Sequence, residues 1–95
     1  MKVRVAELRQ ITEMLFEHLE SEGKHEFDID DDYYWTIGPD QLYNPMTDPK
    51  ELGLEQLTDN WEWLSRVRNR EQEPLAYHLV WLAAILRWIG ERVVR

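Results

Sequence analysis

The sequence predicts a mainly α protein, folded as a single-domain three-helix bundle with a long turn-rich aromatic segment between the first and second helices. Three stretches repeat apolar residues at steps of three and four, the spacing of an amphipathic helix. The chain has 95 residues and no cysteine. One domain covering residues 1–95 must therefore be held by its hydrophobic core, without disulfides or thiolate metal sites.

The first helix is predicted over about residues 3–22. Its apolar positions recur at helical spacing: Val5, Leu8, Ile11, Leu15 and Leu19. The helix should end near Ser21, because Gly23 adopts the left-handed conformation that follows a helix at little cost.

Residues 25–37 change to a two-residue period, with apolar residues on both sides of a run of acids: Phe27, Ile29, Tyr33, Trp35 and Ile37. Two structures fit this pattern: a short β-hairpin over 25–37 that turns at residues 30–32, and an extended loop with the same alternation. A two-stranded ribbon is marginal alone in water, so the hairpin would have to lie across the helices.

Residues 38–53, GPDQLYNPMTDPKELG, contain three prolines and two glycines, and we expect mostly turns. Leu42, Tyr43 and Met46 are expected to attach this segment to the core.

A second helix is predicted over about residues 58–70, with Trp61 on its apolar face. Thr58 or Asp59 could accept hydrogen bonds from the free amides of its first turn. Asp59 and Glu62 also have the spacing of a capping box.

A third helix is predicted over about residues 74–94 and is expected to be central, with Pro74 at its first position. It carries two apolar stripes: one of Leu75, Leu79, Leu82, Leu86, Ile89 and Val93, and an adjoining one of Trp81, Ile85 and Trp88. The first two helices would cover one stripe, and the aromatic segment 33–46 or a second subunit would cover the other. His78 lies on the adjoining stripe, where a hydrogen-bonded, partly buried imidazole is expected. The tryptophans at helical spacing are most simply core residues: Trp61, Trp81 and Trp88.

Charge is unevenly distributed along a chain of net charge −8. Residues 17–62 hold fourteen Asp and Glu against two lysines, whereas residues 66–95 hold six arginines and three glutamates. Direct nucleic-acid binding needs clustered cations, so this balance argues against it and favours a basic protein partner. An acidic surface that simply keeps a small protein soluble is the alternative.

The most apolar segment, residues 74–90, is shorter than the roughly 20 residues that a membrane span needs and contains Arg87. The first residues become helical and charged without the apolar run of a signal peptide. We therefore expect a cytoplasmic protein that does not bind membranes.

The octapeptide DIDDDYYW, residues 28–35, begins like a calcium loop, with Asp28, Asp30 and Asp32 at positions one, three and five. Position six is Tyr33 and position twelve is Pro39, where such a loop needs glycine and a bidentate glutamate. We therefore predict no metal site. The three histidines are scattered, and no nucleophile elbow or phosphate-binding glycine pattern is visible, so neither an enzyme nor a cofactor is expected.

The same octapeptide could instead form a docking surface. Carboxylates would steer a basic partner and nearby aromatics would anchor it. The candidate partner-binding residues are Asp28, Asp30, Asp31, Asp32, Tyr34, Trp35 and Tyr43. A solvated acidic turn that leads into a buried aromatic cluster is the competing interpretation.

The stretch YYWTI, followed by LY and then LGLEQLTDNWEWL, resembles small acidic bacterial proteins that carry Tyr-Trp-x-Ile before a Leu-x-x-Gly-x-Leu-x-Asp helix entry. The resemblance covers roughly residues 33–64. It implies a bacterial origin and no enzymatic activity, and it assigns no functional residue.

Two functions remain open. The first is an acidic interaction module that occludes a basic protein surface, as immunity proteins, antitoxins and nucleic-acid-mimicking inhibitors do, with a toxin or nuclease as partner. The second is a self-associating structural or adaptor protein, a homodimer with no inhibitory role.

Overall fold

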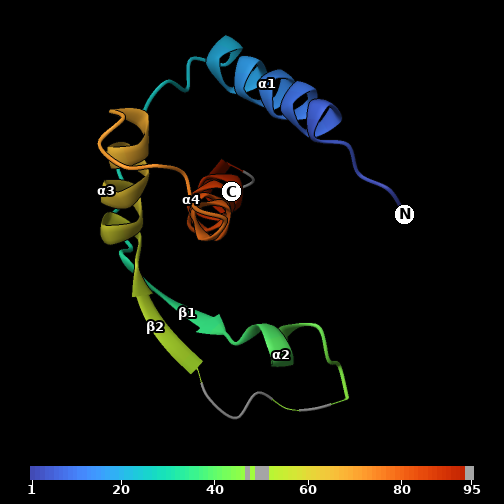
Figure 1. The fold of residues 1–95 in the computed structure, drawn as a ribbon. Coiled ribbons are helices and arrows are strands. Elements are labelled where there is room, and N and C mark those ends of the chain that lie inside the picture. The colour runs from blue at the N-terminus through green and yellow to red at the C-terminus, as the bar shows by residue number, and fades with distance from the viewer. Residues whose placement is uncertain (47, 49–51, 94–95) are drawn as a thin grey trace.

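The protein is mainly α, as the sequence predicts. A computed structural model describes residues 1–46, 48 and 52–93, which form four helices and one two-stranded antiparallel sheet (Figure 1). In chain order the elements are α1 (Val5–Ser21), β1 (Tyr33–Ile37), α2 (Pro39–Leu42), β2 (Leu52–Gln56), α3 (Leu57–Arg68) and α4 (Tyr77–Val93). The three-helix count is not matched, because α2 adds a four-residue helix inside the turn-rich segment.

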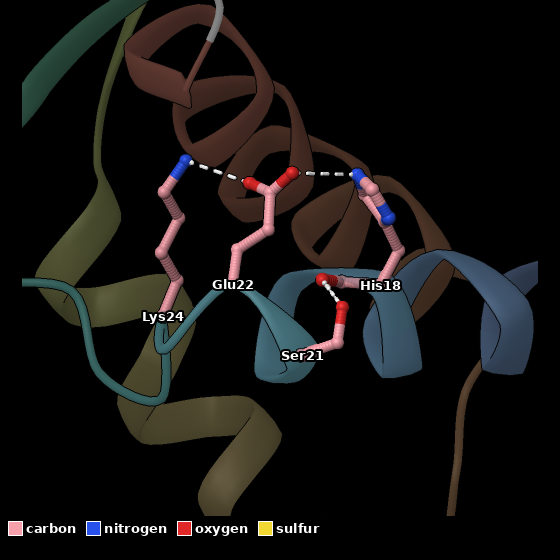
Figure 2. A network of polar contacts seen from close by, with 4 residues as sticks. All are labelled: His18, Ser21, Glu22 and Lys24. Atoms are coloured by element: carbon pink, nitrogen blue, oxygen red, sulfur yellow. Dashed lines mark hydrogen bonds and ion pairs between the residues drawn. The ribbon is translucent and has the colours of Figure 1, made fainter.

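Helix α1 ends where the sequence predicts. Gly23 has a φ of 80° and donates its amide hydrogen to Glu20 O, while the Lys24 amide donates to Leu19 O at 3.0 Å. This pair of hydrogen bonds is the Schellman arrangement, which satisfies carbonyls at the end of a helix. A side-chain bridge covers the same turn: Glu22 binds His18 on one side and Lys24 on the other (Figure 2). The hydrogen bond from Lys24, and the nearby charge of His18, lower the pKa of Glu22.

The expectation that the three long helices share one core is wrong for α1. No residue of this helix is buried, and it lies apart from α3 and α4 as a separate arm (Figure 1). The periodicity of Leu8, Ile11 and Leu15 predicted an apolar face correctly. It carried no information about what covers that face.

Neither structure considered for residues 25–37, the local hairpin or the extended loop, describes the whole segment. Residues 25–32 form no strand, and β1 pairs instead with β2 in an antiparallel register that sets Trp35 opposite Leu54. The predicted partner strand, around Phe27 and Ile29, lies beside α3 and α4, where those two side chains are half-buried. At Gly53 a Cβ atom would lie 2.5 Å from Thr36 Oγ1, so a larger residue there would require the threonine side chain to shift.

The core lies between α3 and α4. Leu57 and Ile85 are only 3% and 4% exposed, and the rings of Trp63 and Trp81 pack with their centroids 4.5 Å apart. His78 is buried against Trp81, and its Nδ1 accepts a hydrogen bond from the Leu75 amide, as expected of a structural imidazole. The adjoining stripe of α4 therefore packs inward.

Several expected core contacts are absent. Trp61 is 52% exposed, and Leu42, Tyr43 and Met46 are exposed instead of attaching their segment to the core. Of the other α4 stripe, Leu75, Leu79 and Leu82 are exposed as well. These side chains lack a cover because α1 and the hairpin do not fold back over α3 and α4.

The starts of α3 and α4 are shifted from their predicted positions. Helix α3 begins at Leu57, one residue early, and α4 begins at Tyr77, so Pro74 precedes the helix rather than opening it. No helix in the described part of the chain is long and apolar enough to cross a membrane.

We predict that Ile85→Ala lowers the free energy of unfolding by about 2 to 5 kcal/mol, because it leaves a cavity in the small α3–α4 core. Val80→Ala is the matched control on the same helix. Val80 is exposed, so its loss should change stability by no more than about 0.5 kcal/mol. Urea denaturation measures both, and equal losses for the two variants would contradict this placement of the core.

Candidate interaction surface

The four acids of the predicted docking surface divide into two pairs. Asp31 forms an ion pair with Arg92 of α4, and Asp32 binds the start of α3. Asp28 and Asp30 are exposed, and no hydrogen bond or ion pair joins their carboxylates to another described residue. Only this second pair is available to steer a partner without giving up a contact within the chain.

Asp32 caps α3 from 26 residues away. Its Oδ1 accepts hydrogen bonds from the Thr58 amide at 2.7 Å and from Thr58 Oγ1 at 2.8 Å, and its carbonyl accepts one from the Leu57 amide at 2.8 Å. The first two free amides of the helix are thereby satisfied. The predicted local cap at Thr58 or Asp59, with its capping box, is wrong, because the N-cap position is Gln56 and its side chain makes no capping hydrogen bond.

One face of the β1–β2 hairpin is exposed and apolar. Side chains alternate across a sheet, and the pairs Tyr33–Gln56, Trp35–Leu54 and Ile37–Leu52 lie on this face. Trp35 is 67% exposed, and Tyr33, Leu52 and Leu54 are also exposed. We call Tyr33, Trp35, Leu52 and Leu54 the hairpin face. The alternation around Trp35 identified one strand of this face, but the contributions of Leu52 and Leu54 were missed because their strand was not predicted.

Tyr34 lies on the other side of β1, partly buried. Its hydroxyl is 2.9 Å from Glu55 Oε2 and 2.6 Å from Asn60 Oδ1, and Asn60 is fully buried. Burial, and next the hydrogen bond to Glu55, raise the pKa of Tyr34 well above its ordinary value. This tyrosine ties β1 to β2 and α3, so its hydroxyl is already occupied within the chain.

Tyr43 is the most exposed of the candidate aromatics, at 84%. It follows α2, beyond the end of β1 that lies opposite the acids (Figure 1). The five residues of β1 span roughly 16 Å, so the structure does not gather Tyr43 and the acids into one compact site. Asp28 and Asp30 precede the hairpin face along the chain, and Tyr43 follows it.

A groove of about 880 Å³ opens between residues 25–29, α3 and α4. Its apolar lining comes from Phe27, Ile29, Leu57, Trp61, Ile85 and Ile89, and its polar lining from His25, Glu26, Asp28 and Thr58. The sequence pattern gave no sign of it, because a groove depends on which faces stay uncovered. Among the described residues no group of three His, Asp or Glu side chains could hold a metal ion.

No protein-family model, curated protein or solved structure matches this chain. Its function is therefore inferred from the residues themselves.

We predict that Asp32→Ala lowers the free energy of unfolding by about 0.5 to 2 kcal/mol, the usual effect of removing a side-chain cap. Asp30→Ala removes the same charge two residues away, where the carboxylate is exposed, and should be nearly neutral. Chemical denaturation of both variants at one salt concentration compares them. A loss as large for Asp30→Ala would show that charge, and not capping, matters here.

We also predict an alkaline loss of stability that depends on Tyr34. Its raised pKa means that the folded state holds the phenolic proton more tightly than the unfolded state does. This stabilisation is complete below the unfolded pKa of about 10 and is lost as the pH rises above that value. In Tyr34→Phe the fall in melting temperature above pH 10 should be shallower, whereas Tyr43→Phe should behave as the parent chain does.

Proposed function

We propose that this protein is a small acidic interaction module that binds and occludes a basic protein surface through its hairpin face and the neighbouring Asp28 and Asp30. The observation that supports the proposal most is the hairpin face itself, a contiguous apolar surface that nothing in the described chain covers. Exposed apolar surface of this kind marks interaction sites in proteins.

The composition of the surface indicates the chemistry of the partner. Trp35 and Tyr33 offer aromatic faces to which a guanidinium or ammonium group binds favourably. Asp28 and Asp30 supply carboxylates that pair with the same cations and raise the association rate. A surface rich in arginine and lysine fits both features.

Such binding would occlude the partner's basic surface, because the carboxylates would take the places where nucleic-acid phosphates sit. Immunity proteins, antitoxins and nucleic-acid-mimicking inhibitors work in this way, with a toxin or nuclease as the basic partner. The proposal assigns the chain no catalytic step and no cofactor. A self-associating adaptor is the second candidate, favoured by the uncovered apolar faces of α1 and α4.

We predict that Asp28 and Asp30 act on the association rate and Trp35 on the dissociation rate. Affinity capture from a lysate of the source organism should recover a basic protein, identified by mass spectrometry. With that protein, Asp28→Asn together with Asp30→Asn should slow association and flatten its salt dependence. Glu13→Gln together with Glu17→Gln removes the same charge from α1 and is the matched control, which should slow association less.

Trp35→Ala should instead speed dissociation, by an amount equivalent to about 2 kcal/mol or more if Trp35 anchors the partner. Thr36→Ala is its control, because Thr36 belongs to the same strand and faces the other way. Association and dissociation rates at two salt concentrations separate the effects. If the double variant Asp28→Asn and Asp30→Asn and the variant Trp35→Ala both bind and dissociate at wild-type rates, the hairpin face is not the binding surface.

A further inference from the structure

The apolar stripe of α1 needs a cover that the chain itself does not provide. Leu8 and Leu15 are 50% and 60% exposed, and Val5 and Ile11 on the same face are also exposed. Helices in proteins draw most of their stability from packing of an apolar face, and this 17-residue helix has no such packing within its own chain. Something must therefore contact this stripe.

The groove between residues 25–29, α3 and α4 offers apolar side chains against which the α1 stripe could pack. Ile85 and Ile89 line its α4 side and Trp61 its α3 side. Leu82 and Leu86 precede the two isoleucines by three residues, so they extend the apolar surface along the neighbouring face of α4. A helix lying in this groove would cover Trp61 and much of the exposed leucine stripe together.

The chain exposes more surface than a compact monomer of its mass does, and a dimer would cover part of that excess. The chain exposes 8508 Å², whereas a compact monomer of 11.5 kDa exposes about 5,800 Å². Its radius of gyration is 15.3 Å, against about 12.4 Å for a compact domain of this length. The excess is roughly 2,700 Å² per chain, or roughly 5,400 Å² for a pair, which is at the upper end of the range of obligate homodimer interfaces.

The cap at the end of α1 orients the helix relative to the residues that follow it. The hydrogen bonds of Gly23 and Lys24 and the Glu22 bridge set the direction in which the chain leaves the helix (Figure 2). In that direction α1 passes clear of α3 and α4 of its own chain (Figure 1). A second chain can approach the stripe without breaking this cap.

Two-fold symmetry doubles the contact. In a symmetric dimer the arm of each copy would lie in the groove of the other, so the same contact occurs twice.

We propose that two copies of this chain form an arm-exchanged dimer, in which α1 of each copy lies in the apolar groove formed by residues 25–29, α3 and α4 of the other. The hairpin face takes no part in this contact, whereas Asp28 lies in the wall of the groove. Each chain contributes both halves of the interface, the arm and the groove.

Sedimentation equilibrium of the full chain over about 1 to 100 µM tests the mass, and the expected species contains two chains. Leu15→Glu and, separately, Leu8→Glu should raise the dimer dissociation constant by at least about tenfold. Glu13→Gln with Glu17→Gln, on the opposite face of α1, should leave it unchanged, as should Trp35→Ala. A parent chain that is monomeric overturns the proposal, whether small-angle scattering gives a compact or an extended radius of gyration.

A mixing experiment distinguishes arm exchange from pairing of two α1 helices. Leu15→Glu disables the arm, and Trp61→Glu disables the groove, so each variant alone should be monomeric. Mixed together, they retain one intact contact between the arm of the groove variant and the groove of the arm variant, so heterodimers should form. Failure of the mixture to associate, with circular dichroism showing both variants folded, would overturn the exchange.

A covalent test does not depend on those variants. Because the chain has no cysteine, Leu15→Cys and Ile89→Cys can be introduced in separate copies. Oxidation of the mixture should give a disulfide-linked heterodimer in preference to either homodimer. A dominant Leu15→Cys homodimer would instead place α1 against α1 and contradict the proposed interface.

Discussion

The packing of Trp81 of α4 against Trp63 of α3 is the contact on which the rest of this structure depends. Leu57 and Ile85 are buried in the same α3–α4 core, and the acidic turn is fixed to this helix pair at two points, through the Asp32 cap on α3 and the Asp31 ion pair with Arg92. The hairpin is then placed by β2, which runs directly into α3. Both the hairpin face and the groove owe their positions to this one helix pair.

The small α3–α4 core includes buried polar groups that lower its stability. Four buried N–H groups have no hydrogen-bond partner among the described residues: Asn60 Nδ2, His78 Nε2, Trp81 Nε1 and Trp88 Nε1. An unsatisfied buried donor costs about 1 to 3 kcal/mol, which is a large share of the stability of a small domain. Burial of the α1 stripe in a partner would add the apolar contact area that the separate chain lacks.

Much of the local structure could be predicted from the sequence, and much of the packing could not. The three- and four-residue period of Val5 to Leu15 and the glycine at 23 are local signals, and they placed α1 and its end correctly. Alternation around Trp35 identified a strand but not its partner, because two-residue periodicity is the same whichever strand it pairs with. The Asp32 cap joins residues 26 positions apart, and no short-range pattern marks it. Exposure of Trp61 was missed for a similar reason, since periodicity shows that a face is apolar and not whether another element reaches it.

The direct passage from β2 into α3 has a mechanical consequence. Gln56 ends the strand and Leu57 begins the helix, with no residue between them to serve as a joint. Asp32, which immediately precedes β1, clamps the same corner through the Leu57 and Thr58 amides. The hairpin therefore cannot swing relative to α3 without unwinding the first helical turn. A partner that bound at Trp35, as proposed, would meet a preorganised platform, so little conformational entropy would be lost on contact.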